Sequence, residues 1–391
     1  MNLHIFQDSI GHYASQTYER LRKIDTEGRE NLFINLTDQI DGTKIEGVVQ
    51  FNRNWPDVLH FINKIDDLNR VYFHCYNHYS QYLLRQIRKV NKDVLFVWIF
   101  WSGEFYNLPE FLPEIYLGYS QQFIPPIYTG FWKKIKSKVF NFREWAFQRP
   151  YYIHRNFIRS FNKIGFFAGV LQEDYNTIIN YSGAKMKYTQ FAYLSYDQFV
   201  KKDLVLPAEY KQPNKFKLMI NHSGDPTLNH FDVFERLENI SYSGEIVLPL
   251  AYGDEKYMAE IKDYANTQWK DRVIFWDTFS RPEEYVKKQE YIDFAVFNSK
   301  IQQGFGNIIA LLWFGVKIFF REENSIYIDF KRWGIKVFSI QSDFTEEHLV
   351  SRLSEEEIEQ NRVILKKYLS NDVVNGYYKS LIELQLKENG N

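Results

Sequence analysis

The most informative stretch of this chain is IQQGFGNIIALLWFGVKIFF, residues 301–320. It follows the apolar run FAVF (294–297) and predicts a turn, an apolar helix and a second strand: Gly304 and Gly306 open the helix, and Gly315 ends it. Glycines at a helix start let a diphosphate approach the backbone, where free N–H groups and the helix dipole stabilise its negative charge. The alternative is a tight turn that only requires a positive φ angle.

Two further segments repeat this plan of strand, polar turn and helix. In LMINHSGDPTLNHFDVFERL (218–237) a polar loop, 222–229, separates a short strand from an amphipathic helix. In VLPLAYGDEKYMAEI (247–261) Gly253 lies at the turn. The loop 222–229 also has an ordinary reading, in which it only connects strand and helix and Asn229 or Thr227 is the N-cap. Because open α/β sheets bring the carboxyl ends of neighbouring strands together, the three turns predict one binding crevice.

Short apolar runs alternate with helical patterns along the whole chain, which is typical of an α/β fold. A length of 391 residues favours two domains. The polar stretch 201–215 holds two prolines and precedes a new strand, so it reads as a linker. We therefore predict two Rossmann-like lobes with a cleft between them: an N-terminal lobe, 1–200, and a C-terminal lobe, 216–391, that includes the terminal helices.

Composition narrows the class of protein. Hydrophobic residues make up 45% and charged residues 25%, the balance of a globular protein. A single cysteine, Cys75, excludes an internal disulfide and a multi-cysteine zinc site, and favours a reducing compartment such as the cytoplasm. The N-terminal residues show no secretory signal, and the longest apolar runs fall short of the roughly 20 residues that span a bilayer.

One segment, residues 131–163, is strongly basic. It carries nine Lys or Arg residues, a single acid, Glu144, and ten aromatic residues. This mixture suits anionic lipid headgroups and the acyl boundary, so it predicts peripheral contact with a membrane. The alternative is a solvated pair of helices whose aromatic residues face the core. No nucleic-acid recognition motif accompanies the segment, and no nucleic-acid partner is expected.

The C-terminal segments together resemble the TDP-N-acetylfucosamine:lipid II N-acetylfucosaminyltransferases, glycosyltransferase family 56, which build enterobacterial common antigen. The likeness rests on NHSGDPTLNH (221–230), LPLAYGDEKY (248–257), QQGFG (302–306) and FFREENSIYID (319–329). In the N-terminal half it is thinner and rests on FHCYNHY (73–79) and WSGEFY (101–106), where Glu104 stands in place of the family's aspartate.

This resemblance implies a glycosyltransferase with a GT-B fold, and the single cysteine and the basic segment 131–163 predict that it is peripheral to the cytoplasmic side of the bacterial inner membrane. The resemblance further implies a dTDP-linked 4-acetamido-4,6-dideoxyhexose (Fuc4NAc-like) donor, a polyprenyl-diphosphate-linked glycan acceptor, and neither cofactor nor metal. The chain has no D-x-D triplet, the carboxylate pair with which GT-A enzymes hold Mg²⁺ or Mn²⁺.

The turn at 302–306 also looks like the donor-site element of many GT-B enzymes, in which E-G-F-G starts a helix. Gln303 replaces that glutamate, and Leu311 stands where a second acid holds the ribose hydroxyls. This departure is compatible with a deoxyribose donor such as a dTDP-sugar.

The predicted donor site comprises the amides and polar side chains of the three turns, together with the start of the FFREENSIYID segment. Its residues are Asn221, Ser223, Gly224, Asp225, Asn229, Tyr252, Gly253, Gln302, Gln303, Gly304, Gly306, Asn307, Arg321 and Asn324. They would stabilise the departing diphosphate as preorganised donors. For Arg321 the alternative is a surface ion pair with Glu322 or Glu323.

Inverting transfer also needs a base that takes the proton of the acceptor hydroxyl, and we expect it in the N-terminal lobe. The candidates are Glu104, ranked first, Asp8 and His12. Each also has an ordinary reading as a helix cap or a surface residue. His74 and His78 have i, i+4 spacing, but no third ligand accompanies them and no zinc site is expected.

Two other functions remain open from the sequence. A GT-B nucleotide-sugar 2-epimerase would use the same donor lobe without an acceptor. A glycan-binding scaffold would keep the fold without turnover.

Overall fold

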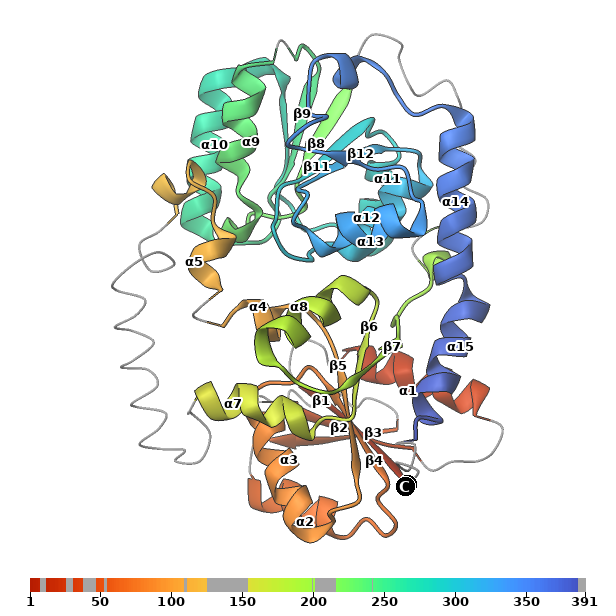
Figure 1. Ribbon diagram of the computed structural model, residues 1–391. Helices are drawn as coiled ribbons and strands as arrows, with labels where there is room; N and C mark the ends of the chain where they lie inside the picture. The colour runs from red at the N-terminus through yellow and green to blue at the C-terminus, as the bar shows by residue number, and fades with distance from the viewer. Residues whose placement is uncertain are drawn as a thin grey trace. The chain divides into compact units, whose positions relative to one another are not determined.

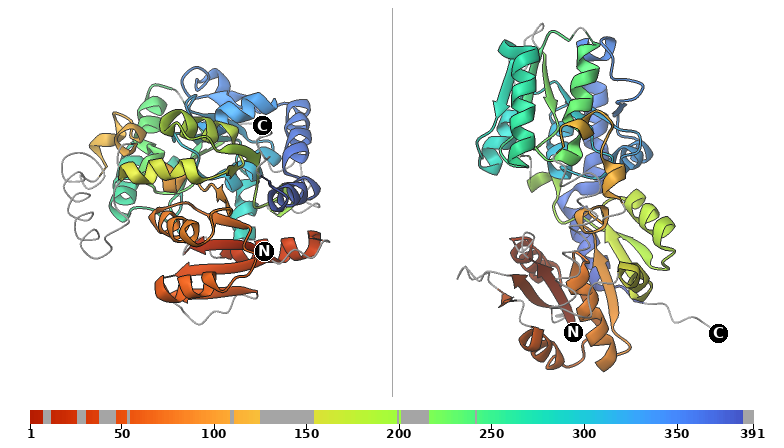
Figure 2. Two further views of the ribbon diagram at one scale, coloured as in Figure 1. Left: turned by 60° about the horizontal axis from the view of Figure 1, so that its bottom comes forward. Right: turned by 90° about the vertical axis from the view of Figure 1, so that its left-hand side faces the viewer.

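The computed structural model describes residues 1–7, 12–25, 31–37, 47–52, 55–108, 111–124, 154–198, 200, 216–240 and 242–385. These form two compact units, each a parallel sheet covered by helices (Figure 1). The first unit draws on Met1–Phe105, Lys138–Leu194 and Asp372–Asn391, and the second on Tyr106–Ser137 and Ser195–Asn371. Figure 2 shows the same elements from two further sides.

The sheet of the first unit has seven parallel strands in the order β3-β2-β1-β4-β5-β6-β7. They are β1 (Asn2–Gln7), β2 (Asn31–Thr37), β3 (Val48–Asn52), β4 (Arg70–His74), β5 (Leu95–Ile99), β6 (Phe166–Gly169) and β7 (Lys187–Gln190). The order reverses between β1 and β4, as in a doubly wound Rossmann fold. Every residue of β1 and β5 is buried, which suits strands covered on both faces.

Among the described residues, six helices of the first unit lie between these strands in the chain, and a seventh comes from the C-terminal end. They are α1 (His12–Ile24), α2 (Trp55–Asn63), α3 (His78–Val90), α4 (Gly103–Tyr106), α7 (His154–Ser160), α8 (Gln172–Ser182) and the terminal α15 (Asn371–Ile382). Asn77 caps the N-terminus of α3, because its side chain accepts hydrogen bonds from the backbone N–H groups of Tyr79 and Ser80. Gly183, in the left-handed region, ends α8.

The last helix, α15, belongs to the first unit although it comes at the end of the chain. The Tyr72 hydroxyl of β4 donates to the Leu381 carbonyl at 3.0 Å, and Arg70 Nε donates to the Leu384 carbonyl at 2.8 Å. Arg20 of α1 donates to Asn375 Oδ1 at 2.6 Å. The C-terminal helix is therefore held against β4 and α1 of the N-terminal unit.

The second unit has a six-stranded parallel sheet in the order β10-β9-β8-β11-β12-β13. Its strands are β8 (Lys217–Ile220), β9 (Glu245–Pro249), β10 (Val273–Trp276), β11 (Phe294–Phe297), β12 (Lys317–Phe320) and β13 (Phe338–Ser339). The helices, shown in Figure 1, are α5 (Leu112–Ile115), α9 (His230–Glu238), α10 (Glu255–Trp269), α11 (Pro282–Gln289), α12 (Phe305–Trp313), α13 (Ser325–Trp333) and α14 (Glu355–Leu369). The order reverses between β8 and β11.

The predicted α/β class with two Rossmann-like lobes is confirmed, and so is the strand, turn, helix and strand reading of 294–320. The division of the chain is less simple than two consecutive lobes, since Tyr106–Ser137 lies in the second unit and α15 in the first. The expected linker, 201–215, and most of the basic segment, 131–153, lie outside the described residues. Within the described part of the chain, no helix is long and apolar enough to cross a membrane.

Candidate functional site

The strongest candidate site lies at the carboxyl edge of the second sheet, where the strand order reverses. Three loops leave this edge: 221–229 after β8, 250–254 after β9 and 298–304 after β11. We call them the switch-point loops. Ligands of open α/β sheets bind in the crevice at such a reversal.

Three buried asparagines join the loops that follow β8 and β11. Asn221 has a positive φ of 59°, and its Oδ1 accepts from the backbone N–H of Asn298 at 3.0 Å. Asn298 Nδ2 donates to the Asn229 carbonyl at 2.8 Å. Each of the three is at most 1% exposed. Since buried amides are costly to leave unpaired, these bonds fix the two loops against each other.

Two glycines join the loops that follow β8 and β9. Gly224 N–H donates to the Tyr252 carbonyl at 2.8 Å, and the Asp254 N–H donates to the Gly224 carbonyl at 3.1 Å. Gly253 has φ of 143°, and a Cβ there would lie 2.3 Å from the carbonyl carbon of Gly224. Only glycine permits this approach of two backbones.

The turn before α12 contacts the loop that follows β8. Gly304 has φ of 68°, and a Cβ there would lie 2.8 Å from Nδ1 of His222. The neighbouring Gln303 donates from Nε2 to Thr227 Oγ1 at 2.7 Å, and Thr227 in turn donates to Asp225. The structure thus brings the three predicted turns together.

The N-terminus of α12 opens on these loops without a side-chain cap. The first N–H groups of a helix have no intrahelical acceptor, so those at the start of α12, which includes Gly306 and Asn307, are available to an anion. The arrangement suits a phosphate group, because N–H groups and the helix dipole both favour negative charge there.

The two residues predicted from the FFREENSIYID segment have different surroundings. Asn324 is buried; it caps α13 and donates to the carbonyls of Ser299 and Ile301 at 2.8 and 2.9 Å, so it holds the loop after β11 in place. Arg321 forms an ion pair with Glu323 at 2.8 Å. Its Nε is buried and has no hydrogen-bond partner among the described residues.

Other members of the predicted set lie on the loops themselves. Tyr252 is 52% exposed, and Gln302 is partly exposed. Ser223 is buried and lies close enough to hydrogen-bond the Tyr252 hydroxyl.

Neither His222 nor Asn298 had a predicted role, and Thr227 was considered only as a helix cap, but in the structure all three join the loops. His222 and His230 are buried, and desolvation lowers their pKa values to about 4 and about 3 respectively. Both imidazoles are therefore neutral at pH 7. Two signals could have indicated His222: its place directly after a predicted strand, and its inclusion in the segment NHSGDPTLNH (221–230).

In the first unit, Glu104 lies at the start of α4, just beyond the carboxyl end of β5. Its Oε1 accepts from Trp98 Nε1 at 3.0 Å and from the Trp101 N–H at 2.9 Å. Its Oε2 is buried and has no partner within the described ranges. Burial raises the pKa of Glu104 to about 7, against the opposing effect of those hydrogen bonds. A carboxyl group in this state can accept a proton near neutral pH.

A line of hydrogen bonds runs beside this carboxyl group. Asn31 Oδ1 can only accept, so His4 Nε2 donates to it at 3.4 Å, and His4, neutral because burial lowers its pKa, accepts at Nδ1 from His74 Nε2 at 3.0 Å. His74 is neutral for the same reason, so its Nδ1 accepts from the Tyr193 hydroxyl at 2.5 Å, and that hydroxyl accepts from Trp101 Nε1 at 2.9 Å. The line assigns both tautomers and fixes the Trp101 indole.

The other residues considered as a base or as metal ligands are Asp8, His12, His74 and His78. Asp8 lies outside the described residues, and His12 is the first residue of α1. His74 pairs with His4, while His78 begins α3. Among the described residues there is no group of three or more His, Cys, Asp or Glu side chains that could hold a metal ion.

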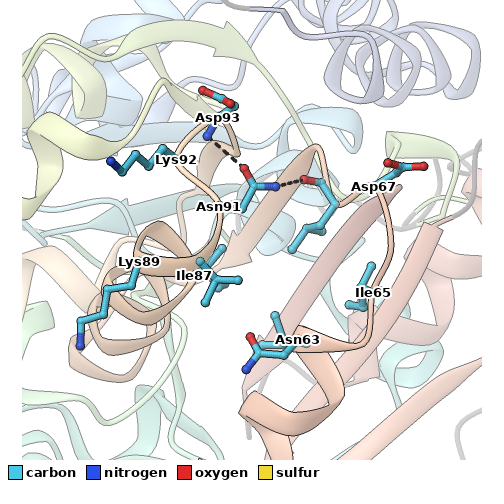
Figure 3. Close-up of a pocket in the computed structure, with 11 residues that line it drawn as sticks. Asn63, Ile65, Asp67, Ile87, Lys89, Asn91, Lys92 and Asp93 are labelled. Atoms are coloured by element: carbon cyan, nitrogen blue, oxygen red, sulfur yellow. Dashed lines mark hydrogen bonds between the residues drawn. The ribbon is translucent and has the colours of Figure 1, made fainter.

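A hollow of about 480 Å³ in the first unit does not coincide with either candidate site (Figure 3). It lies between the loops that precede β4 and β5, where Asn91 Nδ2 donates to the Leu68 carbonyl at 3.1 Å. These loops are at the amino ends of the strands. Because α/β sheets bind ligands at the carboxyl ends, we place the chemistry at the other edge.

Comparisons with known proteins identify a family that the chain matches and solved structures that share its fold. The model of a family described as 4-alpha-L-fucosyltransferase glycosyl transferase group 56 matches residues 143–382. The match includes the switch-point loops but not Glu104, Asp8 or His12. Among curated protein sequences, none matches the chain significantly.

Solved structures of glycosyltransferases share the architecture of the whole chain. Sucrose-phosphate synthase from Thermosynechococcus elongatus has a TM-score of 0.64 at 9% identity, covering 98% of each chain. HepE from Anabaena, solved in complex with UDP and glucose, has a TM-score of 0.59 at 9% identity, covering 98% of this chain and 99% of its own. At such identities the likeness establishes the fold, which is of the GT-B type.

Proposed function

The chain belongs to the 4-alpha-L-fucosyltransferase family, glycosyl transferase group 56, and on that premise we propose its donor and acceptor. It is a glycosyltransferase with a GT-B fold, as the sequence predicted. We propose that it transfers a 4-acetamido-4,6-dideoxyhexose from a dTDP-sugar to a polyprenyl-diphosphate-linked glycan, as part of bacterial surface polysaccharide synthesis.

The observation that carries this proposal is the set of switch-point loops at the uncapped start of α12. The glycine contacts and paired amides hold the loops together, while the first N–H groups of α12 have no side-chain cap. These N–H groups can bind a diphosphate, which is the part common to nucleotide-diphosphate sugars. A related fold is solved with UDP and glucose, which supports a nucleotide-sugar donor.

The choice of dTDP rests on Leu311. It lies in α12 where the resemblance to other GT-B enzymes implies an acid for the ribose hydroxyls, and it is fully buried and apolar. A deoxyribose has one hydroxyl group fewer to satisfy. The absence of that acid therefore favours a deoxyribonucleotide donor.

We expect dTDP to raise the melting temperature more than UDP, GDP or ADP at equal concentrations. A ligand at 100 times its Kd stabilises the native state by about 2.7 kcal/mol, which corresponds to roughly 5 °C or more for a domain of this size. Differential scanning fluorimetry measures the shift, and a repeat in EDTA tests whether binding needs a metal.

A preference for UDP or GDP would contradict the dTDP donor. Stabilisation without acceptor-dependent release of dTDP would favour the 2-epimerase. If no nucleotide raised the melting temperature, the scaffold reading would replace the enzyme at this site.

The acceptor proposal rests on the family and on the basic segment 131–163, which suits the anionic surface where a polyprenyl diphosphate lies. Within this proposal the enzyme is peripheral to the cytoplasmic side of the inner membrane. Glu104 is the proposed base for the acceptor hydroxyl.

We expect the protein to bind vesicles that contain anionic phospholipid, and binding to weaken as salt is raised. Changing Lys133, Lys134, Lys136 and Lys138 to Gln should lower vesicle affinity at least tenfold, because each lysine near the surface contributes about 1 kcal/mol. Co-sedimentation measures this.

The matched control changes four exposed lysines elsewhere to Gln: Lys256, Lys287, Lys367 and Lys379. If both variants lost the same vesicle affinity, the effect would be one of net charge alone. That result would contradict the proposal that the segment 131–163 contacts the membrane.

A further inference from the structure

We propose that His222 contacts the donor directly, by donating a hydrogen bond from Nδ1 to the diphosphate at the start of α12. The inference rests on the proposed nucleotide-sugar donor and adds a specific residue to its site. It makes His222 a binding residue for the leaving group.

Position is the first support. His222 follows Asn221, whose left-handed backbone turns the chain at the end of β8. The imidazole then lies against Gly304, so that a Cβ on that glycine would meet Nδ1 at 2.8 Å and Cγ at 3.0 Å. Gly304 directly precedes α12, so Nδ1 faces the turn that an anion at this helix would approach.

An unsatisfied atom is the second and independent support. His222 is only 9% exposed, and its Nδ1 is buried with no hydrogen-bond partner among the described residues. The neighbouring amides of Asn221 and Asn229 are both bonded within the loops, to the carbonyls of Leu228 and Thr227. Buried polar atoms are almost always paired, so an orphan at the mouth of a helix N-terminus points to a missing ligand atom.

Charge defines what His222 can supply. Burial lowers its pKa to about 4, and the nearby Asp225 opposes this effect only in part. The ring is therefore neutral at pH 7 and offers one N–H group without a positive charge. A phosphate oxygen accepts such a hydrogen bond, which is strengthened by the charge of the acceptor. The negative charge itself is stabilised by the backbone N–H groups and dipole of α12.

Three variants at this position test the geometry. Asn places an amide N–H near the position of Nδ1, Gln places one near Nε2, and Leu has none. We expect H222L and H222Q to bind dTDP about 10- to 100-fold more weakly than the wild type, since hydrogen bonds to charged groups are among the strongest. H222N should stay within about threefold.

Isothermal titration calorimetry with dTDP and with thymidine makes the comparison. Thymidine lacks the diphosphate, so all four proteins should bind it alike. The melting temperature without ligand shows whether each variant folds; if H222L does not, H222N against H222Q carries the same contrast.

Outcomes separate this inference from the proposed function. If the wild type binds dTDP but H222L and H222Q bind it equally well, the contact of His222 is wrong and the donor stands. Equal losses for dTDP and thymidine would also overturn the contact. If the wild type binds no nucleoside diphosphate, both proposals are overturned.

Discussion

Replacing Glu104 with glutamine is expected to lower kcat at least 100-fold and to leave dTDP binding unchanged. A general base contributes about 10²- to 10⁴-fold to a reaction, and an amide cannot take the proton of the acceptor hydroxyl. Glutamine keeps the volume of the side chain and an oxygen for Trp98 and Trp101. Folding should therefore survive the change.

The pH profile gives a second readout for the same residue. Because the carboxylate is the form that accepts a proton, kcat of the wild type should rise with pH through about 7, the pKa to which burial raises Glu104. In E104Q this rise should disappear. Acceptor-dependent release of dTDP at pH 5.5 to 9 measures both quantities.

The control is Glu114→Gln, at an exposed glutamate of α5, which should leave kcat unchanged. A purely structural Glu104, whose only role is to accept the two indole and backbone hydrogen bonds, predicts a different result. In that case E104Q would keep kcat within about threefold and keep the rise with pH.

Gly253→Ala is expected to destabilise the second unit by about 3 kcal/mol or more and to abolish dTDP binding. Alanine at φ of 143° is strained by about 1–3 kcal/mol, and its Cβ would lie 2.3 Å from the backbone of Gly224. Relieving that clash separates the loops that follow β8 and β9. Overpacking of this kind costs a further 1–3 kcal/mol or so.

A thermal melt followed by circular dichroism measures the loss, expected as a fall of roughly 6 °C or more. Gly183→Ala is the matched control. Gly183 also has positive φ, 65°, but no atom lies within 4 Å of an added Cβ, so only the backbone strain of about 1 kcal/mol applies. Equal effects in the two variants would show that the contact with Gly224 is unimportant.

Local sequence patterns predicted the strands and helices that carry the switch-point loops. Apolar runs of four or five residues indicate buried parallel strands, and the glycines at 253 and 304 mark the turns after them. The structure confirms these elements and brings their turns together, while their role in binding stays a prediction.

Contacts between residues far apart in the chain could not be predicted from local sequence patterns. The strand KYTQ (β7) is polar and partly exposed, so its apolar pattern is weak, and it is defined by its register with β6. The bond between Asn221 and Asn298 joins residues 77 positions apart, and that between His4 and His74 joins residues 70 apart. No spacing rule links such pairs, because the sheet order alone makes them neighbours.

The place of α15 in the first unit bears on how this protein could be recombined with its relatives. A chimaera joined once, within 201–215, would give the N-terminal sheet a foreign terminal helix and lose the matched contacts of Tyr72 and Arg70. An exchange that respects the units needs further junctions, near residues 105, 137, 194 and 371. Exchanging the unit that holds the proposed donor site therefore means grafting two internal segments rather than exchanging halves of the chain.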